Sequence, residues 1–329
     1  AKLRASSENT RPLWPKKKGE SDMDKLIVSN APHIHTSDSS RRVMLDVVIA
    51  LLPATVAAVV IFGTGALKVI AACVIGAVVS EALFDLATHR KQTVGDFSAV
   101  VTGLLLGLNL SSSVPVWQCV VGSAFAIIIV KCLFGGLGHN FANPAISGRV
   151  FMLLAFSEVA GGAMPAVVEL EASATPLELI SAGSEQLPSL MDMFLGLRGG
   201  AVGESCILAL LIGYAYLCAR RVIKWYVPAA FVGTVFVLSL VSAGSFVTAL
   251  YSVMAGGVFL GAIFMATDYV TTPINNTGRV VFAVGCGVIT FVIREFCAYP
   301  EGVSFSILAM NILTPYIEKW TAKKPLGGV

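Results

Sequence analysis

The residues best suited to covalent chemistry lie in one polar loop, roughly residues 161–200, of an otherwise apolar chain. Residues 169–176 of this loop read Glu-Leu-Glu-Ala-Ser-Ala-Thr-Pro. The ring of Pro176 disfavours helical geometry at the preceding residue, so we expect Thr175 on an extended, exposed segment between small side chains. A hydroxyl presented in this way suits covalent modification. The alternative is a solvated connector without chemistry.

A second group of reactive side chains consists of carboxylates within or near apolar runs. Such groups are costly inside a membrane and are usually functional, for example along a path for Na+ or H+. Two have simpler interpretations: Asp46 lies near the start of its helix, where the dipole favours an acid, and Glu295 has Arg294 or Lys131 as alternative partners. The six carboxylates are Asp46, Glu81, Asp85, Asp268, Glu295 and Glu301.

The composition places these groups in an integral membrane protein. Of the 329 residues, 56% are hydrophobic and 13% are charged, whereas soluble domains carry about 25% charged residues. The mean hydropathy is +0.80. The small net charge of +3 argues against nucleic acid as a partner. The seven cysteines form no Cys-x-x-Cys pair, so we expect no zinc or iron–sulfur centre held by this chain alone.

Ten apolar runs are candidates to cross the bilayer, whose core takes about 20 helical residues. Two of them, 97–112 and 143–160, are short and bounded by Gly, Asn, Pro and Ser, which is typical of discontinuous helices around a buried site. We therefore predict an all-α polytopic membrane protein. The ten runs are 43–62, 66–88, 97–112, 116–134, 143–160, 201–219, 227–244, 248–266, 279–297 and 302–318.

The chain also repeats itself. Residues 98–107 line up with residues 252–261 at an offset of 154 (252 − 98), and the first run lines up with the sixth. Each unit then holds five helices, and an odd number inverts the second copy relative to the first. Paired Gly-x-x-x-Gly spacings allow close helix packing, which we expect near the pseudo-two-fold axis. These glycines are Gly103, Gly107, Gly257 and Gly261.

Basic residues in the short loops predict the orientation, because Lys and Arg mark the cytoplasmic side. They occupy the N-terminal segment, alternate loops and the C-terminal segment, whereas the opposite side has little beyond Arg198. We expect both termini in the cytoplasm and the Thr175 loop outside. The predicted parts are a basic tail (1–42), a first repeat (43–160), the outward loop (161–200), a second repeat (201–318) and a C-terminal tail (319–329).

Four motifs in order resemble one protein family. Residues 135–145 read Gly-Gly-Leu-Gly-His-Asn-Phe-Ala-Asn-Pro-Ala and 264–268 read Phe-Met-Ala-Thr-Asp; 299–302 read Tyr-Pro-Glu-Gly and 309–315 read Ala-Met-Asn-Ile-Leu-Thr-Pro. This series is similar to the D subunit of the Rnf ion-translocating electron-transport complex. That subunit is homologous to the B subunit of the Na+-translocating NADH:quinone reductase. The resemblance covers roughly residues 24–320.

The resemblance implies a urea-transporter-like fold of about ten helices in two inverted five-helix repeats. It also implies FMN joined by a phosphoester to the threonine of an Asp-x-x-Ser-Gly/Ser-Ala-Thr motif, attached by a flavin transferase on the exported side. Thr175 matches that threonine, and Ser173 and Ala174 precede it. The sequence departs from the motif at Glu169, in place of Asp, and at Ala172. The loop 161–200 is then the flavin-attachment loop.

The family also carries a second, non-covalent flavin, usually riboflavin, buried towards the cytoplasm. The candidates to hold it are Thr102, Asn140, Asn143 and Asp268, because amides donate and accept hydrogen bonds at once, as a flavin edge requires. The alternative is that Asn143 and Asp268 only cap helix ends. Thr175 is expected to be an attachment point, so no catalytic residue and no metal ligand are predicted.

The resemblance implies a translocase subunit of a bacterial inner-membrane ferredoxin:NAD+ oxidoreductase that moves Na+ or H+. The chain has no nicotinamide-binding Gly-x-Gly-x-x-Gly after a strand, so we expect it to be inactive alone. Its expected partners are an iron–sulfur membrane pair, an FMN-bearing G-type subunit, and cytoplasmic subunits that interact with NAD and ferredoxin. The alternatives are a B-type quinone-reductase subunit and a stand-alone solute channel on the same scaffold.

Overall fold

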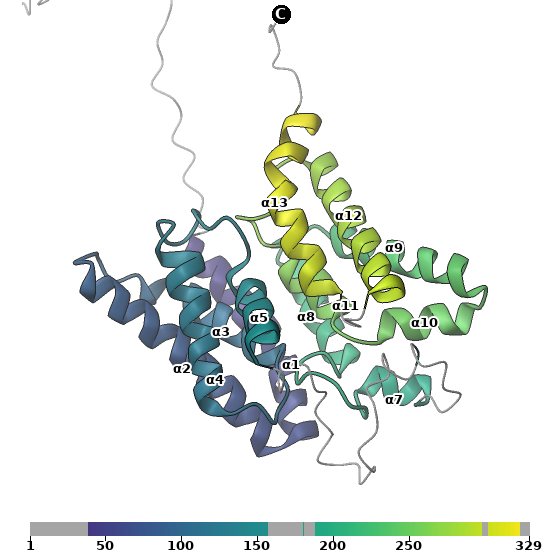
Figure 1. Ribbon diagram of the computed structural model, residues 1–329, viewed down its shortest axis with the longest axis horizontal. Helices are drawn as coiled ribbons and strands as arrows, with labels where there is room; N and C mark the ends of the chain where they lie inside the picture. Colours follow the sequence, from purple (N-terminus) through teal and green to yellow (C-terminus); the bar gives the residue numbers. More distant parts are fainter. Residues whose placement is uncertain (1–38, 157–179, 181–187, 298–301, 323–329) are drawn as a thin grey trace, which may run out of the picture. The chain divides into compact units, whose positions relative to one another are not determined.

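The computed structural model describes residues 39–156, 180, 188–297 and 302–322. Residues 39–329 form one compact unit. Thr175, Ser173, Ala174 and Glu301 lie outside the described residues, as do most of the predicted outward loop and the predicted basic tail up to residue 38. Figure 1 shows the helical part of the chain.

The described residues are helical, and each of the ten predicted runs overlaps a helix or a bent helix pair. The first half contains α1 (Ser40–Phe62), α2 (Thr64–Ala87), α3 (Ser98–Leu108), α4 (Val116–Ala124) with its π-helical continuation Phe125–Cys132, and α5 (Pro144–Ala155). The second half contains α7 (Leu190–Leu195), α8 (Ile207–Ala219), α9 (Tyr226–Ala243), α10 (Phe246–Met254), α11 (Val258–Leu260) with its π-helical continuation Gly261–Met265, α12 (Asn276–Phe296) and α13 (Val303–Thr321).

Helix length separates these elements into two kinds. Within the described residues, α1, α2, α9 and α12 are long and apolar enough to cross a membrane, and the bent pair of α10 and Val258–Met265 makes a fifth candidate. By contrast, α3 has 11 residues and is about 17 Å long, whereas the bilayer core is about 30 Å thick. The prediction that 97–112 and 143–160 are short helices is confirmed.

The predicted run 248–266 is a bent pair of helices and not one helix, because the helix breaks after Met254. Its two parts meet at 65°, and Gly256 at the break has a φ of +65°, a conformation that glycine adopts readily. Arg294 of α12 donates hydrogen bonds to the carbonyls of Ser252 (2.6 Å) and Ala255 (3.1 Å). These bonds satisfy backbone groups that the break releases and that lipid could not satisfy.

Close packing at glycine joins α2 to α3. A Cβ on Gly103 would lie 2.6 Å from the Cα of Val74, and one on Gly107 would lie 3.0 Å from the Cα of Ile70. The predicted close approach at this Gly-x-x-x-Gly pair is confirmed, and its partner is α2. In the second half α12 packs between α9 and α13, and α1 packs against α8 (Figure 1).

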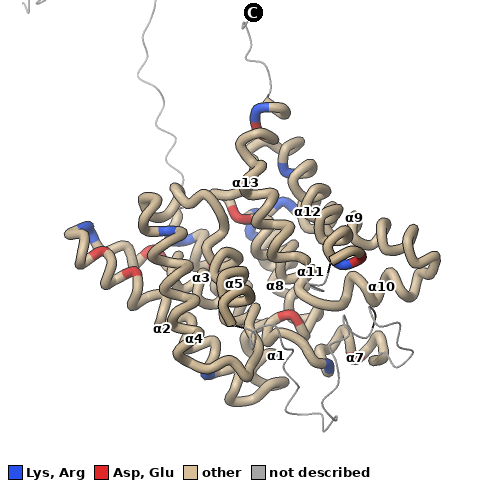
Figure 2. The backbone as a smooth tube through the Cα atoms, viewed as in Figure 1, with Lys and Arg blue, Asp and Glu red and all other residues tan. Residues whose placement is uncertain are grey.

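Charge is sparse along the helices, as Figure 2 shows. Many large apolar side chains on the long helices are exposed, among them Val60 on α1, Ile75 on α2 and Val241 on α9. Exposed apolar faces on helices of this length suit contact with lipid. The described end of the predicted outward loop is folded: Ser189 caps α7, and Met193 of α7 is buried beside Ile207 and Met254.

Candidate cofactor site

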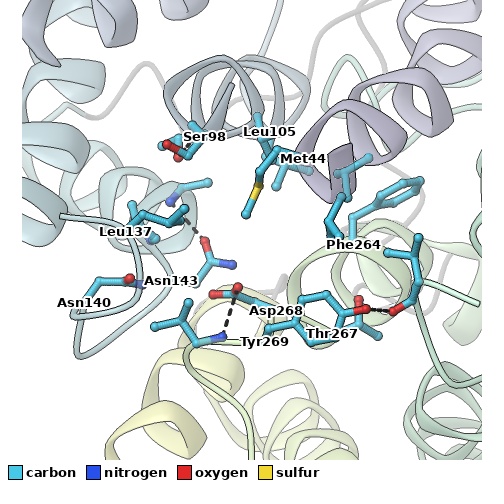
Figure 3. Close-up of a pocket in the computed structure, with 18 of the residues that line it drawn as sticks. Met44, Ser98, Leu105, Leu137, Asn140, Asn143, Phe264, Thr267, Asp268 and Tyr269 are labelled. Carbon is cyan, nitrogen blue, oxygen red and sulfur yellow. Dashed lines mark hydrogen bonds between the residues drawn. The ribbon is translucent and has the colours of Figure 1, made fainter. Parts of the chain in front are cut away.

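A pocket opens among the ends of several helices. It offers about 90 Å³ to the centres of water-sized molecules. Its walls come from the first turns of α1 and α3, the loop before α5, the end of α8, and the turn after Met265 (Figure 3). The apolar part of the lining consists mainly of Val43, Val47, Val101, Leu105, Leu137, Leu217, Ile223 and Phe264.

All four residues predicted to hold a non-covalent cofactor line this pocket. Thr102 comes from α3, Asn140 and Asn143 from the loop before α5, and Asp268 from the turn after Met265. Thr102 and Asp268 are 166 residues apart (268 − 102) in the sequence. The structure therefore brings together residues that sequence reasoning selected from three separate motifs.

Asn143 both caps α5 and faces the pocket. Its Oδ1 accepts hydrogen bonds from the backbone N–H groups of Ala145 (3.0 Å) and Ile146 (3.3 Å), so the predicted capping role is confirmed. The Nδ2 of the same amide points towards the centre of the pocket in Figure 3. The nearby Asn140 donates from Nδ2 to the carbonyl of Ala142 at 3.0 Å. Within the described residues, the two N–H groups of Asn143, the second N–H group of Asn140 and Oδ1 of Asn140 therefore remain for a ligand.

Asp268 orders the turn after Met265, which forms another part of the pocket wall. Its Oδ2 accepts from Thr271 Oγ1 at 3.0 Å and its Oδ1 accepts from the N–H of Val270 at 3.4 Å. Asp268 follows the last helical residue, Met265, and so lies outside the spanning segments. Burial raises the pKa of this carboxyl above its ordinary value, and the two hydrogen bonds partly oppose the shift.

The pocket also contains a buried cation that the sequence reasoning paired wrongly. Lys131, at the end of the π-helical stretch after α4, lines the pocket and is 2% exposed. Its Nζ lies 2.8 Å from Glu81 Oε1 and 2.6 Å from Ser98 Oγ. Of the two alternative partners considered for Glu295, Lys131 is therefore excluded, and Glu295 Oε1 accepts from Ser242 Oγ at 3.1 Å.

The other predicted intramembrane acids also have partners. Asp85 Oδ2 accepts from the N–H (2.9 Å) and Oγ1 (3.0 Å) of Thr93. Asp46 accepts from Tyr216 at 2.9 Å and pairs with Arg220 at 3.2 Å. The interpretation of Asp46 as an acid placed by the helix dipole alone is therefore incomplete, because a side-chain pair holds it against α8.

A second buried cluster, away from the pocket lining, was missed. Arg149 of α5 lies 3.5 Å from Glu204 Oε1 and donates to the carbonyl and Oδ1 of Asn109. Asn109 in turn contacts Met265 Sδ at 3.8 Å. The signal available in the sequence was a charged residue within each of the two apolar runs 143–160 and 201–219. The partner is invisible there because it lies 40 to 55 residues away (149 − 109 and 204 − 149).

These features define a class: a polytopic all-helical membrane protein with a pocket of mainly apolar walls and a few polar groups. Comparison with known proteins then identifies the family. The model of the NQR2, RnfD, RnfE family matches residues 27–327, so this chain belongs to that family.

Curated relatives match over almost the whole chain. The D subunit of the Na+-translocating ferredoxin:NAD+ oxidoreductase complex of Acetobacterium woodii is 44% identical over 92% of this chain and 95% of its own. The D subunit of the proton-translocating ferredoxin:NAD+ oxidoreductase complex of Clostridium ljungdahlii is 37% identical over 92% and 96%. The D subunit of the ion-translocating oxidoreductase complex of Alcanivorax borkumensis is 36% identical over 92% and 97%.

Proposed function

We propose that this chain is the D subunit of an ion-translocating ferredoxin:NAD+ oxidoreductase, the Rnf complex. The observation that carries the proposal is the 44% identity to such a subunit over 92% of the chain. Since the complexes of two relatives translocate Na+ and protons respectively, the ion moved here is Na+ or H+. The chain acts as a membrane subunit of the translocase, with other subunits supplying the ferredoxin, NAD and iron–sulfur sites.

The first cofactor in this proposal is FMN, held by a phosphoester between its phosphate and Oγ1 of Thr175. Ser173 and Ala174, which precede Thr175 in the sequence, are too small to shield that hydroxyl. The protein then lies in the bacterial inner membrane with both termini in the cytoplasm. The acceptor loop faces outward, where a flavin transferase acts. A tether of this kind keeps the flavin beside neighbouring subunits while its ring remains free to pack.

The second cofactor is a non-covalent flavin, riboflavin as the resemblance implies, in the pocket between α1, α3, α5 and α8. The donor set of the pocket fits this group. Apolar side chains such as Val47, Leu105 and Phe264 suit the faces of a flat ring. The amides of Asn140 and Asn143, with the hydroxyl of Thr102, supply donors and acceptors for its polar edge.

Bound flavin supplies the one- and two-electron chemistry, and the protein supplies position and electrostatics. The loop before α5 fixes the amides, because Asn143 is held by the α5 backbone and Asn140 by Ala142. Asp268 and its turn close the opposite wall. The pocket lies at the ends of α1, α3 and α8 that adjoin the predicted cytoplasmic loops, which supports electron transfer from the outer flavin towards the cytoplasm.

In-gel flavin fluorescence of the denatured chain tests the proposal. After expression with a flavin transferase, we expect a fluorescent band that survives SDS and disappears in Thr175→Ala. The band remains in the matched control Ser184→Ala, which removes a hydroxyl of the same loop outside the motif. A band that persists in Thr175→Ala would place the attachment elsewhere. A chain with neither covalent nor extractable flavin would instead favour the solute channel, which needs no flavin-acceptor loop.

A further inference from the structure

Lys131 brings a positive charge to the wall of the pocket. Its side chain is almost fully buried, and its ammonium donates to Glu81 Oε1 and Ser98 Oγ. An ammonium has three N–H donors, and these two acceptors are its hydrogen-bond partners within the described residues. One donor of a buried cation therefore remains at a cavity that Lys131 itself lines.

The acids around Lys131 lie behind it, away from the cavity. Glu81 receives a second hydrogen bond from Thr93 Oγ1 at 2.5 Å, and Asp96 accepts from Ser98 Oγ. Lys131 and Ser98 are part of the pocket lining, whereas neither of these two carboxylates is. Of the charged groups in this cluster, the ammonium of Lys131 is thus the one that lines the pocket. Across the cavity stands Asp268, whose carboxylate is engaged by its own turn.

A buried charge acts strongly in such a site, because the surrounding dielectric is low. A buried ion pair is a weak source of stability compared with apolar packing, so stability alone does not account well for Lys131, Glu81 and Ser98. Lys131, held in place by Glu81 and Ser98, instead provides a preorganised positive charge beside the pocket. Such a charge stabilises a ligand that becomes more negative when it is reduced.

We propose that Lys131, positioned by Glu81 and Ser98, raises the reduction potential of the flavin bound in this pocket. The inference rests on the proposed function, because it requires a flavin there. One electron passes to the flavin from a one-electron donor of the complex, an iron–sulfur centre or the covalent flavin, and that donor is oxidised. The ring gains one negative charge, and no proton leaves Lys131. The ammonium favours the reduced form over the oxidised form by its charge.

The sign of the effect separates this role from a structural one. Lys131→Met removes the positive charge, so the reduced flavin binds less tightly and the potential falls. Glu81→Gln removes the negative charge behind Lys131, so the potential rises. Lys131→Arg keeps the charge and leaves the potential close to that of the unaltered chain. Damage to packing alone would weaken flavin binding in both charge-removing variants without shifting the potential in opposite directions.

The test is a redox titration of the full-length chain, purified after expression without flavin transferase so that the pocket flavin is the one observed. We expect Lys131→Met to lower, and Glu81→Gln to raise, the ratio of affinities for reduced and oxidised flavin by about tenfold or more, which is about 59 mV for a one-electron couple. The potential of the double variant Lys131→Met/Glu81→Gln is expected to lie between those of the two single variants. The double variant is titrated in place of a single variant that fails to fold.

The outcomes distinguish this inference from the proposed function. If the chain binds flavin that Asn143→Ser releases, yet both charge variants titrate like the unaltered chain, the role of Lys131 is overturned and the flavin site stands. If the full complex and the full-length chain both lack extractable flavin, or Asn143→Ser leaves it bound, the flavin pocket itself is wrong and the inference fails with it.

Discussion

At the scale of single residues, Asn143 carries two roles on one side chain. Its Oδ1 closes the first turn of α5, and its Nδ2 faces the pocket. Sequence reasoning treated a cap and a ligand contact as alternatives. The amide group permits both, because its acceptor and its donor point in different directions.

Mutation can separate the capping role of Asn143 from its contact with the pocket. Asn143→Ser keeps a capping oxygen, since Ser and Asn are about equally good caps, but removes the donor that faces the pocket. We expect little change in unfolding temperature and a loss of extractable flavin. Asn143→Ala loses the cap as well and should cost a further ~1 kcal/mol of stability. Thermal unfolding in detergent and flavin extraction measure the two effects separately. Equal flavin content in Asn143→Ser and the unaltered chain would contradict the ligand role.

At the scale of elements, the position of α3 depends on glycines that allow it to approach α2. Gly103→Ala would place a methyl group 2.6 Å from the Cα of Val74, a backbone atom that cannot rotate away. We expect a loss of about 1–3 kcal/mol of stability and weaker flavin binding, because Thr102 and Leu105 move with α3. The thermal unfolding curve and the flavin content of the purified chain give the measurement.

Gly233→Ala is the matched control. Gly233 lies within α9, and a Cβ there meets no atom within 4 Å. The replacement should be neutral or stabilising by roughly 0.5–1 kcal/mol, because alanine favours a helix over glycine. If Gly103→Ala behaves like Gly233→Ala, the close contact between α2 and α3 does not limit stability.

Periodicity and length predicted the helices well, because apolar runs and their flanking Gly, Pro and Asn residues are local signals. The convergence of Thr102, Asn140, Asn143 and Asp268 was predictable through motifs in separate segments. The break after Met254 was missed, although Gly256 and Gly257 mark it, because the continuous hydropathy of the run outweighed them. The pair of Lys131 with Glu81 was missed because partners 50 residues apart (131 − 81) leave no periodic trace.

At the scale of the whole molecule, ties between distant segments join the two halves of the chain. Asp46 of α1 contacts Tyr216 and Arg220 at the end of α8, and Arg149 of α5 pairs with Glu204 before α8. The start of α1 and the end of α8 therefore meet on one side of the molecule. The orientation predicted from Lys and Arg in the short loops places this side in the cytoplasm.

Labelling with a membrane-impermeant thiol reagent tests that orientation. In a Cys297→Ser background, which removes an exposed native thiol, Met191→Cys on α7 should react in intact spheroplasts, because it is exposed and lies at the predicted outer face. The control Lys91→Cys, which is exposed after α2, should react only after permeabilisation. The reverse pattern would place the termini outside and the Thr175 loop in the cytoplasm.

The spread of the pocket lining along the chain has a consequence for biosynthesis. Its walls begin at Val43 and are complete only with Val270, so 227 further residues (270 − 43) must be translated before every wall exists. At about 5–20 residues per second, this takes roughly 11–45 s of ribosome time. The nascent α1 is therefore in the bilayer before Arg220, the partner of Asp46, has been made. A ligand that needs every wall of the pocket can bind only after the second half has been inserted.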